Sequence, residues 1–351
     1  MKYVRMISIL AVTITLPVWA EEAAKAPTQN LPEQLRLIPP VQLDDDWTWT
    51  TWGWTSGVIK LQDNATDAVW QMTRINTKLQ GRQMAFGLVL ELADLQEDTS
   101  GNWLREAWLE TPIGFDGRLK LRGGLFTLAC GFGNPIIGPF KWDLPFFPAS
   151  IPFSSYAPGV QLRWESDVWT ALWDVTGRSG EAFDSSKLFD RLESSFMLKR
   201  KLDQGCLGIT GQVCDDFLKL GGFLEWRPKP WFCRVEVDGS NYSDDHISNQ
   251  VGGYLLLGRE LFDGQAKLSG IAMYNRQLPK YWTEIVTSVG KNGQVTSAEV
   301  ARNSPDKTDT SIGATAEVFL YRDIVSVKAG YYWSLEPKTP DQGQLQFLLR
   351  F

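Results

Sequence analysis

Hydrophobic and polar residues alternate one by one along most of the chain after residue 46. In the segment 118–126, Leu119, Leu121 and Leu125 take one parity, while Arg118, Lys120 and Arg122 take the other. Segment 160–165 alternates in the same way, with Val160, Leu162 and Trp164 set against Gln161, Arg163 and Glu165. A period of two is the period of a β-strand, so each segment predicts a strand with one apolar and one polar face.

Similar stretches follow one another to the end of the chain. They predict further strands within 47–54, 66–79, 83–92, 102–110, 169–175, 192–198, 218–226, 231–237, 251–257, 266–274, 312–320, 325–333 and 344–351, a hairpin at 281–300 and a Gly-rich hairpin around 205–211. Trp47 and Trp49 share one parity and Trp52 and Trp54 the other, which predicts a bulge near Thr50–Thr51 or a crossing of an aromatic girdle. Glu106, Trp108 and Glu110 share a parity, which leaves the face of that strand open.

Charged residues recur on the polar face of nearly every predicted strand. They are Arg118, Lys120, Arg122, Arg163, Glu165, Lys219, Glu225, Arg234, Glu236 and Lys267. A soluble sandwich buries its inner faces, whereas such charges need a wet interior or ion pairing. The 16 Trp, 18 Phe and 9 Tyr also suit strands in a membrane. We therefore predict an all-β, transmembrane antiparallel β-barrel over 47–351. Roughly 20 residues per strand and turn give about sixteen strands, within a range of 14–18.

The N-terminus predicts export. Lys2 and Arg5 precede an apolar run that is too short to span a bilayer, and Ala20 fits a cleavage site, so residues 1–20 predict a signal peptide; a short N-terminal anchor is the alternative. Residues 21–46 predict a periplasmic leader. Removing the signal peptide lowers the net charge from −6 to −8, which argues against nucleic acid as a partner.

Two features indicate a bacterial outer-membrane channel. The segment 129–158 is rich in Gly, Pro and Phe, and long structureless loops are usually functional. The chain ends in a strand whose last residue is Phe351, which resembles the C-terminal signature of bacterial outer-membrane proteins. That likeness implies recognition by the outer-membrane assembly machinery.

The stretch 119–162 resembles the general and phosphate-selective porins. The matching residues are Leu119–Phe126, Gly131–Gly133 and Tyr156–Leu162. The resemblance implies sixteen strands, a homotrimer and a long inserted constriction loop at Phe132–Ser155. This loop contains only Lys141 and Asp143 as charged residues, so the dense basic set of a phosphate-selective pore is absent.

The predicted pore-lining residues are Arg118, Lys120, Arg122, Arg163, Lys141, Asp143 and Glu106. Rows of charge facing a pore bias which ions enter. Alternatively, the cations pair with Glu106, Glu110 and Glu165 and brace the wall. The Trp-rich strands could stack sugars, but their alternating outward parity favours a girdle at the membrane interface.

The leading hypothesis is a passive diffusion channel for small polar or charged solutes in the outer membrane, in contact with membrane lipid and lipopolysaccharide. The alternative is a plugged, non-channel barrel that acts as a scaffold or adhesin. An enzyme is disfavoured because the sole histidine, His246, lies in a polar loop. We expect no catalytic residues, metal or cofactor. Cys206 and Cys214 could pair across a hairpin or stay reduced, and Cys233 falls on a lipid face.

Overall fold

The computed structural model describes most of the chain after residue 39. The described ranges are 40–62, 65–91, 104–114, 117–129, 156–177, 192–289, 295–304, 306–321, 324–336 and 341–350. The predicted signal peptide, most of the leader, Cys130, the predicted loop Phe132–Ser155 with Lys141 and Asp143, and Phe351 lie outside these ranges. Within them, no helix is long and apolar enough to cross a membrane.

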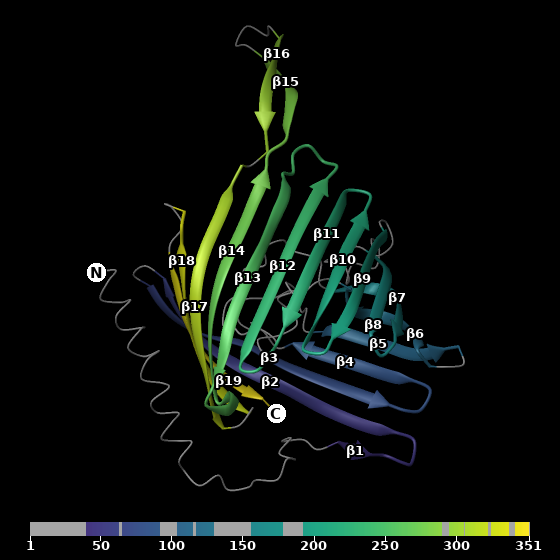
Figure 1. Ribbon diagram of the computed structural model, residues 1–351. Coiled ribbons are helices and arrows are strands. Elements are labelled where there is room, and N and C mark those ends of the chain that lie inside the picture. The colour runs from purple at the N-terminus through teal and green to yellow at the C-terminus, as the bar shows by residue number, and fades with distance from the viewer. Residues whose placement is uncertain are drawn as a thin grey trace.

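A single antiparallel sheet closes on itself to form the barrel (Figure 1). Its strands are β2 (Thr48–Gln62), β3 (Ala65–Gln80), β4 (Ala85–Glu91), β5 (Leu104–Ile113), β6 (Leu119–Thr127), β7 (Tyr156–Glu165), β8 (Trp169–Gly177), β9 (Leu192–Leu202), β10 (Gly205–Cys214), β11 (Phe217–Trp226), β12 (Trp231–Tyr242), β13 (Asn249–Leu261), β14 (Ala266–Leu278), β17 (Thr308–Tyr321), β18 (Val325–Ser334) and β19 (Gln342–Arg350). Consecutive strands pair, and β19 closes the ring on β2, with Phe347 opposite Gly57. The predicted barrel of about sixteen strands is confirmed.

The two ends of the barrel differ. Connections such as 166–168, 203–204 and 262–265 are short and lie at the end where β2 begins and β19 ends. Most connections at the other end are longer. A two-residue strand, β1 (Val41–Gln42), pairs with the first residues of β2 and so attaches the end of the predicted leader to the barrel.

The predicted alternation decides which side chains face the interior. In β12, Trp231 and Val237 are exposed on the outer face, whereas Arg234 and Glu236 are buried on the inner face. The same rule holds in β18, where Lys328 is buried and faces inward. Apolar outer and polar inner faces are typical of a barrel that spans a membrane.

The predicted hairpin around 205–211 is wrong, because β10 runs without a turn from Gly205 to Cys214. Its glycines serve packing instead. A Cβ on Gly208 would lie 2.4 Å from the Phe223 ring, and one on Gly211 would lie 2.4 Å from the Phe196 ring. Cys206 and Cys214 occupy one strand about 26 Å apart. They cannot bridge, and both are free.

The bulge predicted near Thr50–Thr51 is also absent. The register of β2 against β3 is continuous there and shifts only between Ser56 and Gly57. Trp49 therefore lies outward and exposed, while Trp54 shares the inner face with Ser56 and is buried. The change of tryptophan parity takes the aromatic residues from one face of a regular strand to the other.

The hairpin predicted at 281–300 exists but is not part of the wall. β15 (Tyr281–Val289) and β16 (Val295–Asn303) form a separate two-stranded sheet. It stands beyond the rim of the barrel (Figure 1). Strands β14 and β17 pair directly beneath it, from Arg276↔Thr308 to Ala266↔Val318.

Candidate functional site

Three neighbouring strands carry the predicted charge rows on the inner face. Strand β5 contributes Glu106, Trp108 and Glu110, and β6 contributes Lys120 and Arg122. Arg163 and Glu165 come from β7. The register places Arg122 opposite Glu110 and Lys120 opposite Arg163. The face of β5 that the sequence left open is settled, because Trp108 packs inward against the buried Phe126–Ala157 cluster.

Arg122 and Glu110 form a packed pair. The Arg122 Nη2 lies 2.7 Å from Glu110 Oε2, and its Nε lies 3.1 Å from the same oxygen. The guanidinium sits 4.0 Å from the centre of the Trp108 ring. Only 13% of the Arg122 side chain and 10% of the Glu110 side chain are exposed. This pair matches the bracing alternative, since charge-assisted contacts with two donors fix both side chains.

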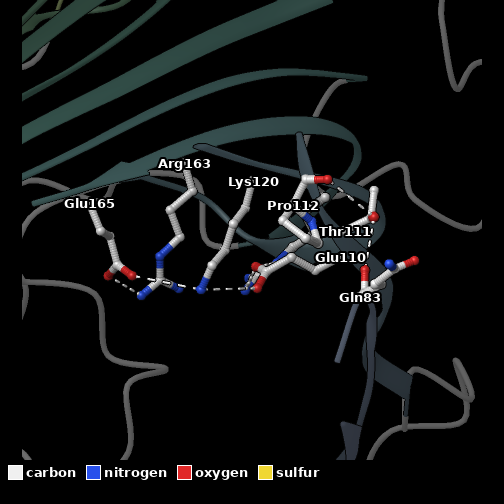
Figure 2. Close-up of polar contacts among 8 residues, drawn as sticks. Gln83, Glu110, Thr111, Pro112, Lys120, Arg163 and Glu165 are labelled. Carbon is white, nitrogen blue, oxygen red and sulfur yellow. Dashed lines mark hydrogen bonds and ion pairs between the residues drawn. The ribbon is translucent and has the colours of Figure 1, made fainter. Parts of the chain in front are cut away.

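The charges beside that pair are more open. Figure 2 shows Glu165, Arg163, Lys120 and Glu110 in one row. The Lys120 Nζ lies 4.0 Å from Glu110 Oε1 and 3.9 Å from Glu165 Oε2, and Arg163 Nη2 lies 2.5 Å from Glu165 Oε1. The Lys120, Arg163 and Glu165 side chains are each 33% exposed. We call these three residues the open charge row.

A small cavity adjoins the open charge row. It has a volume of about 200 Å³ and is lined by Lys78, Glu110, Lys120 and residues of the β3–β4 turn. The turn is tied to β5 by the Thr111 hydroxyl, which donates a 3.0 Å hydrogen bond to the Gln83 carbonyl (Figure 2). The cavity therefore places two ammonium groups beside open space.

The other predicted residues differ in position. Glu106 is held in the wall, where it accepts hydrogen bonds from the Trp108 indole and the Thr127 hydroxyl and lies 3.7 Å from Arg74. Arg118 precedes β6 and is exposed near the short-turn end. Lys141 and Asp143 lie outside the described residues, so their place in the pore stays a prediction.

The chain after β6 turns into the barrel. The Ala129 amide donates to Asp174 Oδ2 on β8 at 2.6 Å, and the Ala129 carbonyl accepts from the Thr210 hydroxyl on β10 at 3.0 Å. Asp174 also accepts from Gln161 Nε2 at 2.8 Å and from Ser195 Oγ at 3.0 Å. The end of the described chain after β6, just before the predicted constriction loop, is thus fixed across the inner wall.

Asp174 and Lys78 were not predicted as site residues. A signal for both was present, because each lies on the polar parity of its strand. Asp174 is also the acidic residue of β8. The alternation cannot show that Ala129 lies close to Thr210, because these residues are 81 positions apart in sequence.

Two inward ion pairs on the far wall, which we define as strands β11, β12, β17 and β18, are largely buried. Lys328 Nζ lies 3.6 Å from Glu317 Oε1, with side chains 1% and 4% exposed. Arg234 lies 2.8 Å from Glu225 and its side chain is 5% exposed. These charges are screened from solvent, so the open charge row on β6 and β7 is the better candidate for contact with a solute.

His246 contacts a carboxylate and an aromatic ring among the described residues. Its Nδ1 lies 2.9 Å from Asp244 Oδ1, and its ring lies 4.4 Å from that of Trp282. Hydrogen bonds from the His246 amide and ring hold the pKa of Asp244 below its usual range. Neither contact supplies a nucleophile. Among the described residues, no three His, Cys, Asp or Glu side chains are grouped to hold a metal ion.

No protein-family model matches the chain, and no curated protein matches it. Solved structures do. In-vitro folded OmpT of Vibrio cholerae, an outer membrane protein in a trimer form, aligns over 88% of this chain and 100% of its own at 10% identity and a TM-score of 0.62. OmpF of Salmonella typhi in complex with daunomycin aligns over 89% and 100% at 11% identity, with a TM-score of 0.62. A mutant porin of Rh. blastica aligns over 86% and 100% at 11% identity, with a TM-score of 0.55. The chain has the fold of the outer-membrane porins.

Proposed function

We propose that this protein is a passive diffusion channel for small polar or charged solutes. The observation that carries the proposal is the open charge row, in which Lys120, Arg163 and Glu165 stay one-third exposed on the inner face of a closed barrel. In a barrel without a water path, inward charges would be buried, as Lys328 and Glu317 are on the far wall. The exposed charges on this inner wall therefore favour a water-filled path for solutes along β6 and β7.

The channel would act by size and charge. Lys120, Arg163 and Glu165 would set the field along the wall, with Lys141 and Asp143 adding to it from the inserted loop. Arg118 would act at the short-turn mouth, and Arg122 and Glu106 would hold the wall in shape. Charged rings bias ion entry without binding the solute tightly.

The barrel fold and the predicted signal peptide support an outer-membrane location. We place the protein in the bacterial outer membrane, with the short turns toward the periplasm and the longer loops outside. A homotrimer is proposed from the porin resemblance, and one OmpT structure is a trimer form. Contact with lipopolysaccharide and delivery by the assembly machinery through Phe351 belong to the same proposal.

The test is single-channel conductance in a planar bilayer under a salt gradient. The double variant Lys120→Gln/Arg163→Gln removes two exposed cations, and we expect the anion-to-cation permeability ratio to fall by about fivefold, as roughly 1 kcal/mol of screened attraction implies. Arg200→Gln is the matched control, because Arg200 is an outward cation on β9, 5.7 Å from the Trp169 ring. An unchanged ratio in the double variant would remove the open charge row from the filter.

The buried far wall favours a second candidate, a plugged barrel that serves as a scaffold or adhesin. The same bilayer experiment separates the two. Correctly folded protein that shows no conductance would support the plugged barrel.

A further inference from the structure

The outer face of the barrel carries an apolar groove that the channel function does not use. It has a volume of about 410 Å³ and runs across β12, β13, β14, β17 and β18. Its floor consists of small outward residues, and its walls are large. The floor contains Gly270, Ala314 and Ala329, and the walls contain Trp231, Leu257, Leu268, Tyr331 and Trp333.

The strand register explains the groove. Leu257 pairs with Gly270, Gly270 with Ala314, and Ala314 with Tyr331, so two small residues lie in one row between two large ones. The adjacent row contains Trp231, Arg259 and Leu268 and borders the groove on one side. Four strand spacings give the groove a width of about 19 Å across the strands. A groove of this width can hold an extended hydrocarbon chain.

A cation lies at one end of the groove. Arg259 lines it two residues before the end of β13, and its guanidinium lies 5.1 Å from the centre of the Trp231 ring. Trp231 is the first residue of β12, so both residues mark the short-turn end of the barrel. Among the described residues, no carboxylate forms an ion pair with Arg259.

Within their described residues, the strands that form the groove present no outward carboxylate beside Arg259. Acidic residues of the groove-forming strands all take inward positions: Glu236, Asp238, Glu260, Asp309 and Glu317. Outward positions of these strands hold apolar residues and a few polar or basic ones. The charge of Arg259 therefore complements an anion that comes from the membrane itself.

We propose that this groove binds an anionic phospholipid of the periplasmic leaflet, with its phosphate on Arg259 and an acyl chain along Gly270 and Ala314. The leaflet rests on the orientation given above, whereas binding itself does not depend on conductance. A guanidinium is suited to phosphate because its donors form a planar fork. The Trp231 ring would cover the glycerol region, where indole is favoured.

The test counts bound lipid by native mass spectrometry. The full-length protein is reconstituted in vesicles of equal phosphatidylglycerol and phosphatidylcholine and extracted in mild detergent. We expect the wild type to retain phosphatidylglycerol in preference to phosphatidylcholine. Arg259→Gln should lower that preference about fivefold, the usual effect of one cation at an anionic membrane surface.

Arg200→Gln is the matched control. Arg200 stacks over Trp169 at the same end of the barrel but does not line the groove. Equal loss of preference in the Arg200 and Arg259 variants would overturn the proposal, because it would reflect interfacial charge alone. Equal retention of the two lipids by the wild type would overturn it as well.

Gly270→Leu tests the groove itself. A Cβ at Gly270 meets no atom closer than the Gly313 carbonyl oxygen at 3.7 Å, so the added side chain extends into the groove. We expect retained lipid to fall with an unchanged heat-modified gel shift. Ala314→Leu provides a second filling variant should Gly270→Leu fail to fold. Unchanged lipid with a smaller oligomer would show that a second copy covers the groove, and would also overturn the proposal.

Discussion

The two walls of the barrel use inward charge differently. On β6 and β7, Lys120 and Arg163 share acidic partners at up to 4.0 Å and remain one-third exposed. On β17 and β18, Glu317 and Lys328 lie 3.6 Å apart and are almost completely buried. Lys120 and Arg163 thus stay open to solvent beside the packed Arg122–Glu110 pair, while Glu317 and Lys328 depend on contacts within the protein. Inward parity alone therefore does not make a residue part of a pore.

Glu317→Gln should have the largest effect on stability. It leaves the Lys328 ammonium in a site where only 1% of the side chain is exposed. Removing one partner of a buried pair typically costs about 3 kcal/mol. Urea unfolding in lipid vesicles measures the loss. A loss below about 1 kcal/mol would mean that Lys328 is hydrated and that the two walls are alike.

Asp174→Asn should have a smaller effect. The carboxylate accepts hydrogen bonds from the Ala129 amide, Gln161 and Ser195, and an amide in its place points donors at donors. We expect a loss of about 2 kcal/mol in the free energy of unfolding. Asp203→Asn, in an exposed turn, is the control and should change it by less than about 0.5 kcal/mol. Equal values for both variants would show that Ala129 is not anchored through Asp174.

Glu165→Gln should have the smallest effect on stability and a visible one on selectivity. Its side chain is 33% exposed, so losing its contacts should cost less than about 1 kcal/mol. It removes the negative member of the open charge row. We therefore expect the anion-to-cation permeability ratio, measured from the reversal potential, to rise about twofold. Glu317→Gln is the matched substitution on the other wall. Equal shifts in selectivity for both variants would show that the two walls do not differ in their contact with permeating ions.

Much of the wall could be predicted because strands have a period of two. The alternation placed Lys120, Arg122 and Arg163 on the polar faces of their strands, and the register puts them on the same face of the sheet as Trp108, which packs against the buried Phe126–Ala157 cluster. The position of Trp108 could not be derived from the alternation. Trp108 faces inward because it packs against the Phe126–Ala157 cluster, a contact that only the folded structure reveals.

Other features depended on contacts between distant strands. The sequence predicts a turn around Gly208 and Gly211, yet these glycines make room for aromatic rings of the neighbouring strands β11 and β9. The difference in exposure between Lys120 and Arg122 is equally invisible in a pattern that assigns both to one face. It arises from the Trp108 ring, which covers Arg122.

The β15–β16 hairpin gives the protein a separable module. Its base is clamped by the Lys280 amide on Ser304 Oγ at 2.7 Å and by Ser248 on Ser304 at 2.9 Å, while β14 and β17 pair below without it. Changes in its length or sequence therefore need not disturb ring closure. The hairpin lies outside the closed wall, so deletion of 281–303 should leave the heat-modified gel shift intact. Such a junction offers a natural point for displaying a foreign peptide.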